Sequence, residues 1–289
     1  QGVVIAPVSA FCRRRAEELP GGGPRRCVET GAPAVVGLDA ATGRERFRVE
    51  TRDVASQSSV GALIGSRLWV ADGPSALRAI VLPAGTAGPR AVVTGTLGAR
   101  SAVGPELLLT LSGRGGSRLA LRVPTSNVAR WQKPVPGAGP CPPVVTAPVA
   151  VLPAFTGASV AGAPRAFMLS SGADLWTVPS PPARVDSCGA IENGVFWQVL
   201  DGAAQGFALA DGRRRGRFAL PSALSGPLFS VLDGVAYVSV LGRLVGMDLI
   251  DGHAAVTLST GAHRQSGLVL HAGSGVVVTR EPGLVIGFD

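Results

Sequence analysis

Few residues in this chain are of types that catalyse reactions, and they are not found at catalytic spacings. The three histidines, His253, His263 and His271, all lie in the last fifth of the chain. None of them accompanies a serine or cysteine nucleophile in a recognisable motif, as a catalytic base would. We expect them to be surface or channel residues, and the sequence predicts no catalytic residue.

Motifs that hold a phosphate, a calcium ion or a nucleophilic serine are also absent. There is no Gly-x-Ser-x-Gly elbow, no EF-hand spacing, and no phosphate-cradling loop around Lys133, the sole lysine. The glycine-rich stretch Gly113-Arg114-Gly115-Gly116 stands between two predicted strands, so we interpret it as a hairpin tip. The sequence therefore predicts no metal, quinone or nicotinamide cofactor.

The four cysteines favour disulfide bonds. Cys12 and Cys27 bracket a polar stretch rich in Arg, Gly and Pro, while Cys141 and Cys188 each precede the first strand of consecutive repeats. We predict the pairs Cys12–Cys27 and Cys141–Cys188, which place the protein outside the cytoplasm: secreted, periplasmic or on the cell surface. A zinc site is the first alternative, although it lacks a Cys-x-x-Cys pair. Free buried thiols are the second.

The strands and turns that position these residues recur with a period of about forty residues along the chain. Each repeat has an apolar strand, a second strand reading apolar-x-Gly/Phe-apolar-Asp/Ala, a polar turn and a third extended piece. The clearest copies are residues 35–47 and 244–252, and weaker ones are 206–212 and 284–289. A period of this length built from strands is typical of a β-propeller. An array of β-sandwiches is the alternative.

The strand before each Asp-bearing strand can be followed through the whole chain. Its starts fall near Val3, Leu68, Leu107, Val149, Val195, Val235 and Val276. The spacing between the first two starts is longer than the period by about one loop, and this excess coincides with the stretch from Cys12 to Cys27. We predict an all-β protein, a β-propeller of four-stranded antiparallel blades. Seven blades are preferred and six or eight stay open, with residues 1–289 as a single domain and a disulfide-stapled insertion at 12–27.

Turns and strand faces agree with this architecture. Asp-Gly pairs, the strongest short hairpin signal, occur at Asp201-Gly202, Asp211-Gly212, Asp233-Gly234 and Asp251-Gly252. Polar and apolar residues alternate over 46–50, as in the outer strand of a blade. Asp39, Asp248 and Asp289 recur at one position of the repeat, where we expect them to accept hydrogen bonds from the following turn.

The two ends of the repeat series are incomplete. The first predicted blade begins at its second strand and the last ends after its third. Gly2 to Val8 is the candidate to supply the missing outer strand of the last blade or to lie nearby, because open sheet edges invite aggregation.

The chain is basic, with a formal net charge of +8. Its arginines cluster at 13–15, 25–26 and 213–215, in turns or insertions, and aromatic residues are only 5% of the chain. No aromatic residue interleaves with these clusters, so the base-stacking platform of a nucleic-acid-binding protein is missing. The longest apolar stretch, 144–155, is broken by Pro148 and Pro153, so no transmembrane segment is predicted.

Residues 39–47, Asp-Ala-Ala-Thr-Gly-Arg-Glu-Arg-Phe, resemble the blade motif Leu-Asp-Ala-x-Thr-Gly-Lys-x-x-Trp of the pyrroloquinoline-quinone-like propeller repeat family. Residues 209–212 and 247–252 match it in part. The family's inter-blade tryptophan is replaced by Phe47 and Phe218, and Trp131 and Trp176 are candidates for that role elsewhere. The adjacent cysteines of the family's quinone-dependent dehydrogenases are missing. The resemblance therefore implies the non-enzymatic branch, similar to envelope assembly-factor and surface propellers that bind other proteins.

We therefore expect a protein-binding or scaffolding subunit of an envelope or surface assembly. A propeller lyase or hydrolase with a site in the central channel is the alternative. The candidate docking element is the insertion, an idle loop being the other reading. It carries Arg13, Arg14, Arg15, Arg25 and Arg26.

Overall fold

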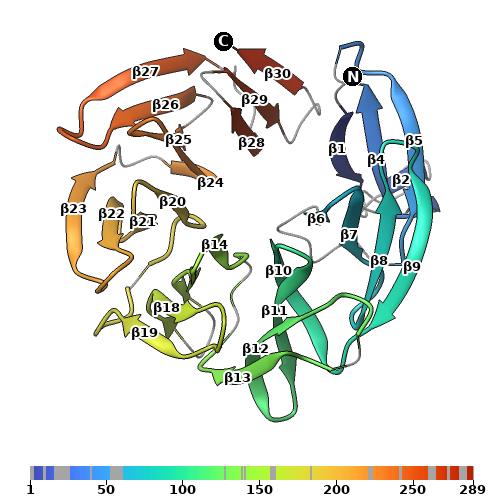
Figure 1. Cartoon of the computed structure of the whole chain (residues 1–289). Coiled ribbons are helices and arrows are strands. Elements are labelled where there is room, and N and C mark those ends of the chain that lie inside the picture. The colour runs from blue at the N-terminus through green and yellow to red at the C-terminus, as the bar shows by residue number, and fades with distance from the viewer. Residues whose placement is uncertain are drawn as a thin grey trace, which may run out of the picture. The chain divides into compact units, whose positions relative to one another are not determined.

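The computed structural model describes most of the chain as strands and turns (Figure 1). The described residues are 3–8, 11–15, 27–39, 41–52, 61–126, 128–137, 139, 141–156, 161–182, 184–220, 224–240, 243–259, 265–271, 274–279 and 285–288. They form two compact units, Gln1–Pro140 and Cys141–Asp289, each of which is treated by itself below. That residues 1–289 make one domain stays a prediction.

The first unit contains three antiparallel sheets that follow one another along the chain. The first has the order β1-β4-β5, the second β6-β7-β8-β9 and the third β10-β11-β12-β13. Their strands are β1 (Val3–Val8), β4 (Ala34–Asp39), β5 (Glu45–Glu50), β6 (Ala62–Ile64), β7 (Arg67–Ala71), β8 (Ala76–Val81), β9 (Thr86–Val92), β10 (Thr96–Val103), β11 (Glu106–Gly113), β12 (Gly116–Arg122) and β13 (Trp131–Val135). A separate pair, β2 (Phe11–Arg15) and β3 (Cys27–Gly31), is inserted between β1 and β4.

The second unit repeats the same plan four times. Its sheets have the orders β14-β15-β18-β19, β20-β21-β22-β23, β24-β25-β26-β27 and β28-β29-β30. Their strands are β14 (Val144–Thr146), β15 (Val149–Leu152), β18 (Arg165–Met168), β19 (Asp174–Thr177), β20 (Ala190–Glu192), β21 (Val195–Leu200), β22 (Ala203–Ala208), β23 (Arg214–Ala219), β24 (Leu224–Leu232), β25 (Val235–Val240), β26 (Arg243–Asp248), β27 (Ala254–Ser259), β28 (Gln265–His271), β29 (Ser274–Thr279) and β30 (Val285–Phe288). A short pair, β16 (Phe155–Thr156) and β17 (Ala161–Gly162), is inserted between β15 and β18.

The predicted strand starts are confirmed. Each of the seven lies within two residues of the start of β1, β7, β11, β15, β21, β25 or β29. The long first step is accounted for by the β2–β3 pair. Among the described residues the first and last sheets have three strands and the other five have four. The number of blades stays a prediction, because these two three-stranded sheets belong to different units.

One of the two roles predicted for Gly2 to Val8, the missing outer strand of the last sheet, is corrected by the strand pairing, while a place near that sheet stays a prediction. Strand β1 pairs with β4 from Val3 opposite Asp39 to Val8 opposite Ala34, so it belongs to the first sheet. Strand β4 is apolar and buried, so it needs a paired neighbour, and β1 pairs with it in continuous register. It is therefore not the outer strand of the last sheet, which has the order β28-β29-β30.

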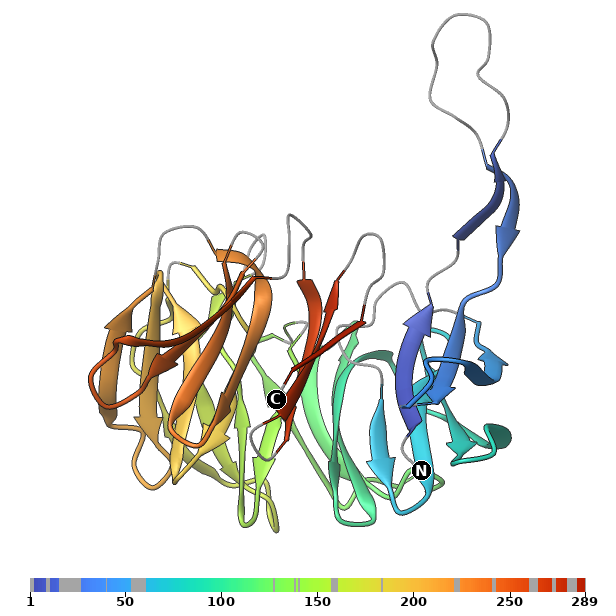
Figure 2. The ribbon, with the colours of Figure 1, turned by 90° about the horizontal axis from the view of Figure 1, so that it is seen from above.

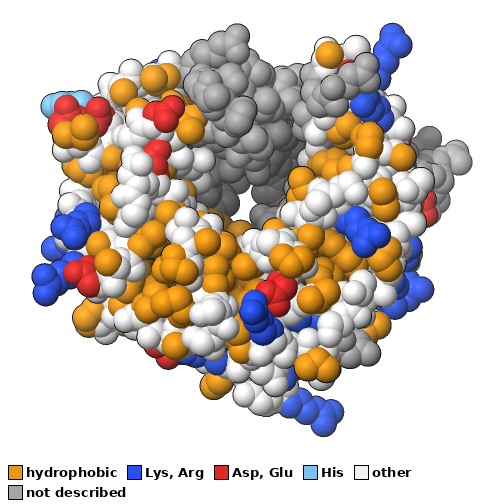
Figure 3. Space-filling view, viewed as in Figure 1, with side chains coloured by type: hydrophobic (Ala, Val, Ile, Leu, Met, Phe, Trp, Pro, Cys, Tyr) orange, Lys and Arg blue, Asp and Glu red, His pale blue; other side chains and the backbone are white. Residues whose placement is uncertain are grey.

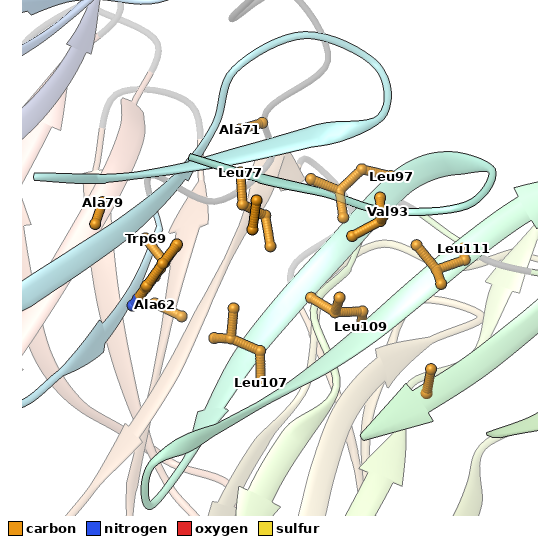
Figure 4. Packing of buried hydrophobic residues seen from close by; sticks show 12 residues of the cluster. Ala62, Trp69, Ala71, Leu77, Ala79, Val93, Leu97, Leu107, Leu109 and Leu111 are labelled. Atoms are coloured by element: carbon orange, nitrogen blue, oxygen red, sulfur yellow. The ribbon is translucent and has the colours of Figure 1, made fainter. Parts of the chain in front are cut away.

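Buried side chains fill the spaces between consecutive sheets within each unit. In the cluster between the second and third sheets, Trp69 and Leu77 from one sheet face Leu107 and Leu109 from the next (Figure 4). Similar clusters join the first sheet to the second, the fourth to the fifth and the fifth to the sixth. Strand β11 is buried along most of its length, as expected for an inner strand, whereas β5 alternates as predicted.

Outer-strand aromatic residues pack on a turn glycine of the next sheet. A Cβ atom on Gly85 would lie 2.0 Å from Cγ of Phe47, and one on Gly252 would lie 2.6 Å from Cδ1 of Phe218. Trp176 has the same relation to Gly212. Phe47, Phe218 and Trp176 therefore occupy the inter-sheet position that the family motif assigns to tryptophan.

The predicted turn chemistry is present. Asp201-Gly202 and Asp233-Gly234 are two-residue hairpins in which both residues have positive φ, at 52° and 73°, and at 51° and 78°. The carboxylate of Asp39 accepts hydrogen bonds from the N–H and the hydroxyl of Thr42 and from the guanidinium of Arg46. These bonds hold the pKa of Asp39 below its ordinary value. Asp248 likewise accepts from the N–H of Ile250, while Asp289 lies outside the described residues.

Candidate functional site

The predicted docking element is a β-hairpin that the first sheet does not need. Strands β1 and β4 pair directly over their whole length, while β2 and β3 pair only with each other. The hairpin continues beyond the ends of β1 and β4 (Figure 2). Its strands begin where that pairing stops, so its removal would leave the ladder of the first sheet intact.

Three of the five predicted docking arginines are on β2. Arg13, Arg14 and Arg15 belong to this strand, which also contains Cys12, and Cys27 opens β3. The side chains of these residues, and Arg25 and Arg26 entirely, lie outside the described part of the chain. The Cys12–Cys27 bond and the docking role of the arginines therefore stay predictions.

The second predicted disulfide is confirmed. Cys141 and Cys188 are bonded, with their Cα atoms 5.2 Å apart. Each lies shortly before the first strand of its sheet, β14 or β20, so the bond ties the fourth sheet to the fifth. A covalent link of this kind persists in an oxidising compartment.

A buried polar network lies beside this disulfide. The amide of Gln198 on β21 accepts from the N–H of Ala154 at 2.9 Å and donates to the carbonyls of Ala154 and Ser187, each at 3.0 Å. The hydroxyl of Ser187 accepts from the N–H of Val199 and donates to the carbonyl of Cys188. Gln198 is fully buried, so these bonds satisfy an amide that would otherwise destabilise the core. Sequence reasoning missed this network, because a lone glutamine on a strand is usually exposed.

A buried carboxylate in the first unit is held by arginines. Asp72 follows β7 and is 1% exposed. It accepts from the backbone N–H of Arg52 at 3.1 Å and from the guanidinium groups of Arg78 and Arg90 at 3.0 and 2.9 Å. Burial alone raises the pKa of Asp72, but these hydrogen bonds outweigh it and hold the pKa below its ordinary value. The cluster links the end of the first sheet to the second and has no open ligand position, so we interpret it as structural.

Arg100, on β10, is another buried charge of this unit. It is 3% exposed and donates from Nε to the carbonyl of Trp69 on β7 at 3.3 Å. Burial lowers the pKa of Arg100 to about 10. The residue thus joins the second sheet to the third rather than facing a ligand.

The one histidine whose side chain is described, His253, is exposed in the turn between β26 and β27. Its N–H donates to Asp251 and its carbonyl accepts from the N–H of Asp248, as expected for a turn residue. The side chain of His271 and all of His263 lie outside the described residues. Within the described ranges no three His, Cys, Asp or Glu side chains gather as a metal site would require, and no helix is long and apolar enough to cross a membrane.

A groove of about 590 Å³ runs between the fourth and fifth sheets in the second unit. One wall is the proline-rich segment 179–182, and the other is formed by Gln205, Asp211, Arg213 and Arg214. Arginine side chains gather along the outer strand β23 (Figure 3). The groove combines charges of both signs with apolar proline rings, which suits polypeptide contact more than one small substrate.

The comparisons with known proteins identify the fold. No protein-family model matches the chain, and no curated protein matches it. The chain is similar to the solved structure of BamB from Moraxella catarrhalis, with a TM-score of 0.61 and 13% identity over 88% of this chain and 78% of that one. It is also similar to the computationally designed protein Ika8, with a TM-score of 0.62 and 10% identity over 89% and 77% of the two chains. The membership suggested by the sequence motif stays a prediction, but the repeated antiparallel sheets and these likenesses show that the chain is an all-β propeller.

Proposed function

We propose that this protein is an extracytoplasmic propeller that serves as a protein-binding or scaffolding subunit of an envelope or surface assembly. The observation that carries the proposal is the β2–β3 hairpin, which is inserted between two strands of the first sheet and takes no part in that sheet. Strands β1 and β4 pair without it. An arginine-rich element that the fold does not use is available for a partner.

Three further observations support this role. The Cys141–Cys188 bond favours an oxidising compartment. The blade motif resembles that of envelope assembly-factor and surface propellers that bind other proteins, and BamB has a similar fold. The protein partner would meet Arg13, Arg14, Arg15, Arg25 and Arg26, so we expect its docking surface to be acidic.

The test is a variant in which residues 13–26 are replaced by a short Gly-Ser turn. This segment carries five arginines and two glutamates, a net of three positive charges. The matched control replaces Arg44, Arg67 and Arg243 with Gln, three exposed arginines outside both the hairpin and the groove, which removes the same net charge. Both proteins are used as bait against cross-linked envelope extracts, and captured proteins are quantified by mass spectrometry.

We expect the hairpin variant to keep its melting temperature within about 3 °C, since the sheet ladder is untouched, while it loses the partners that the wild type enriches. The control should retain them. Equal capture by the wild type and the hairpin variant would show that the hairpin is idle and would overturn the proposal.

A further inference from the structure

Strand β27, the outer strand of the sixth sheet, has an edge with no partner among the described residues. Its sheet has the order β24-β25-β26-β27, so β27 pairs with β26 alone (Figure 1). An outer strand of this kind leaves a row of backbone N–H and C=O groups available to another strand. The first six sheets all end in such a strand, so the side chains of each strand decide whether its edge is blocked.

The other five outer strands carry residues that hinder pairing with a further strand. Charged residues and prolines are common devices for blocking a sheet edge. At least one occurs in each of these strands: Glu45, Arg46, Arg48 and Glu50 in β5, Pro89 and Arg90 in β9, Lys133 and Pro134 in β13, Asp174 in β19, and Arg214, Arg215 and Arg217 in β23. The sequence of β27, Ala-Ala-Val-Thr-Leu-Ser, contains neither a charge nor a proline.

The backbone of β27 does not block its edge either. Its one register shift lies near its start, and the pairings of β5, β9, β19 and β23 have such a shift as well. After the shift the register is regular from Val256 opposite Gly246 to Ser259 opposite Arg243. This stretch therefore presents an uninterrupted backbone edge.

The side chains at this edge are exposed and partly apolar. Residues 254–257 are all exposed, and Val256 is 38% exposed. Ile250, in the turn that leads into the strand, is 88% exposed, the highest value among the large hydrophobic side chains of the described ranges. Pairing with another strand would shield apolar surface here and would also satisfy backbone groups.

The strand that fits this edge best is β27 of a second copy. The chain has a formal net charge of +8, so two copies repel each other wherever their charged segments meet. No antiparallel register of β27 against β27 places like charges opposite each other, because the strand has none. An acidic segment of another protein would instead be attracted to β23, with its three arginines.

We propose that the protein self-associates through antiparallel pairing of β27 with β27 of a second copy, which joins two sheets across a two-fold axis. One strand of each copy makes a small interface by the standard of stable dimers, so we expect a dissociation constant of roughly 10–100 µM. The assembly is independent of the proposed function, since it involves neither the β2–β3 hairpin nor another protein.

The test is sedimentation velocity over protein concentrations from about 5 to about 300 µM. Thr257→Lys places a charge at the exposed edge and should weaken self-association roughly tenfold. The matched control, Thr86→Lys, makes the same change on β9, where Thr86 is also exposed and Pro89 lies in the same strand. The control should associate like the wild type, and both variants should melt within about 3 °C of it, because both side chains are exposed.

A charge exchange separates pairing from any other effect of the substitution. Thr257→Glu alone should also weaken self-association roughly tenfold. An equimolar mixture of the Thr257→Lys and Thr257→Glu proteins should associate at least as tightly as the wild type, because opposite charges then meet across the two strands. Amide hydrogen exchange in residues 254–259 of the wild type should slow by about threefold or more from the lowest to the highest concentration, whereas exchange in β23 should not change.

Three outcomes would overturn the proposal. Protein that stays monomeric up to about 300 µM would leave this edge to a strand of another protein. A dimer that Thr257→Lys leaves intact, or that Thr86→Lys weakens equally, would show that the contact lies elsewhere or depends on total charge. Loss of the dimer in the hairpin variant described above would place the contact on the hairpin, whereas a dimer that survives in that variant stands even if the proposed function fails.

Discussion

Trp176 lies against Gly212 across the boundary between the fourth and fifth sheets. A Cβ atom on Gly212 would lie 2.8 Å from the indole Cδ2 atom, and the indole Nε1 donates to the carbonyl of Leu209 at 2.7 Å. The contact therefore combines ring packing with a hydrogen bond to the same turn. Since Gly212 also has a φ of +70°, a side chain there is disfavoured for two separate reasons.

The first prediction concerns this glycine. Gly212→Ala should lower the free energy of unfolding by about 2–3 kcal/mol, through backbone strain together with a clash against Trp176. Gly234→Ala is the matched control, because Gly234 has a φ of +78° but no atom within 4 Å of the added Cβ. In urea denaturation, the control substitution should lower the free energy of unfolding by only about 1 kcal/mol. Equal losses would mean that the ring contact contributes nothing.

The second prediction exchanges phenylalanine for the tryptophan of the family motif. Phe218 packs on Gly252 in the turn Leu249-Ile250-Asp251-Gly252, which matches the turn that Trp176 contacts. Phe218→Trp should gain a hydrogen bond to the Leu249 carbonyl and stabilise by about 1 kcal/mol. Trp176→Phe should lose about the same amount. Thermal denaturation measures both, and a destabilised Phe218→Trp protein would contradict the inferred equivalence of the two turns.

The third prediction concerns the Cys141–Cys188 bond. Replacing both cysteines with Ser should lower the free energy of unfolding by about 2–4 kcal/mol, because the bond closes a loop across a sequence separation of 47 residues. Wild-type protein in excess reductant should lose at least as much, because reductant also breaks the predicted Cys12–Cys27 bond. Mass spectrometry of the non-reduced protein checks the bond itself, and a free thiol at Cys141 or Cys188 would disprove it.

The fourth prediction is a pH dependence that arises from Asp72. Its pKa in the folded protein lies below the unfolded value, so its stabilising contribution is present above pH 4 and is lost as pH falls through the folded-state pKa. At neutral pH, Asp72→Asn should lower the free energy of unfolding by roughly 2–3 kcal/mol, because it removes the charge that Arg78 and Arg90 pair with. The loss is smaller than for a fully buried ion pair, because both arginines keep part of their contact with water. As pH falls through the folded-state pKa of Asp72, the variant and the wild type should converge.

The control for this titration is Glu45→Gln. Glu45 pairs with Arg48 on the surface, where both side chains are about two-fifths exposed, and such pairs contribute about 0–1 kcal/mol. Its unfolding curve should follow that of the wild type from pH 7 to pH 3. A gap between Asp72→Asn and the wild type that stays constant with pH would show that Asp72 acts through packing rather than charge.

The sequence was informative about strands and turns because these depend on local residue patterns. Asp-Gly pairs such as Asp233-Gly234 specify a hairpin through backbone conformation alone, and the repeat spacing located all seven second strands. The Cys141–Cys188 pair could be predicted because the period places both residues at the same position in consecutive repeats.

The interactions between sheets could not be predicted in the same way. Asp72 with its arginines, Gln198 with Ala154, and Arg100 with Trp69 depend on which side chains meet once the sheets are packed. Of the two roles predicted for β1, the outer strand of the last sheet was wrong, because a sheet edge was assumed to need filling before the register of β1 with β4 was known.

The packing clusters between consecutive sheets have a consequence for how each unit unfolds. In the described residues of a unit, a sheet shares its buried side chains with the sheet before it and the sheet after it. Within a unit, stability then contains a sum of nearest-neighbour terms, and loss of the second or the fifth sheet, each of which shares a cluster with the sheet before it and the sheet after it, removes two of these interfaces. Amide hydrogen exchange should therefore be slow in β7 and β21, which lie inside these two sheets.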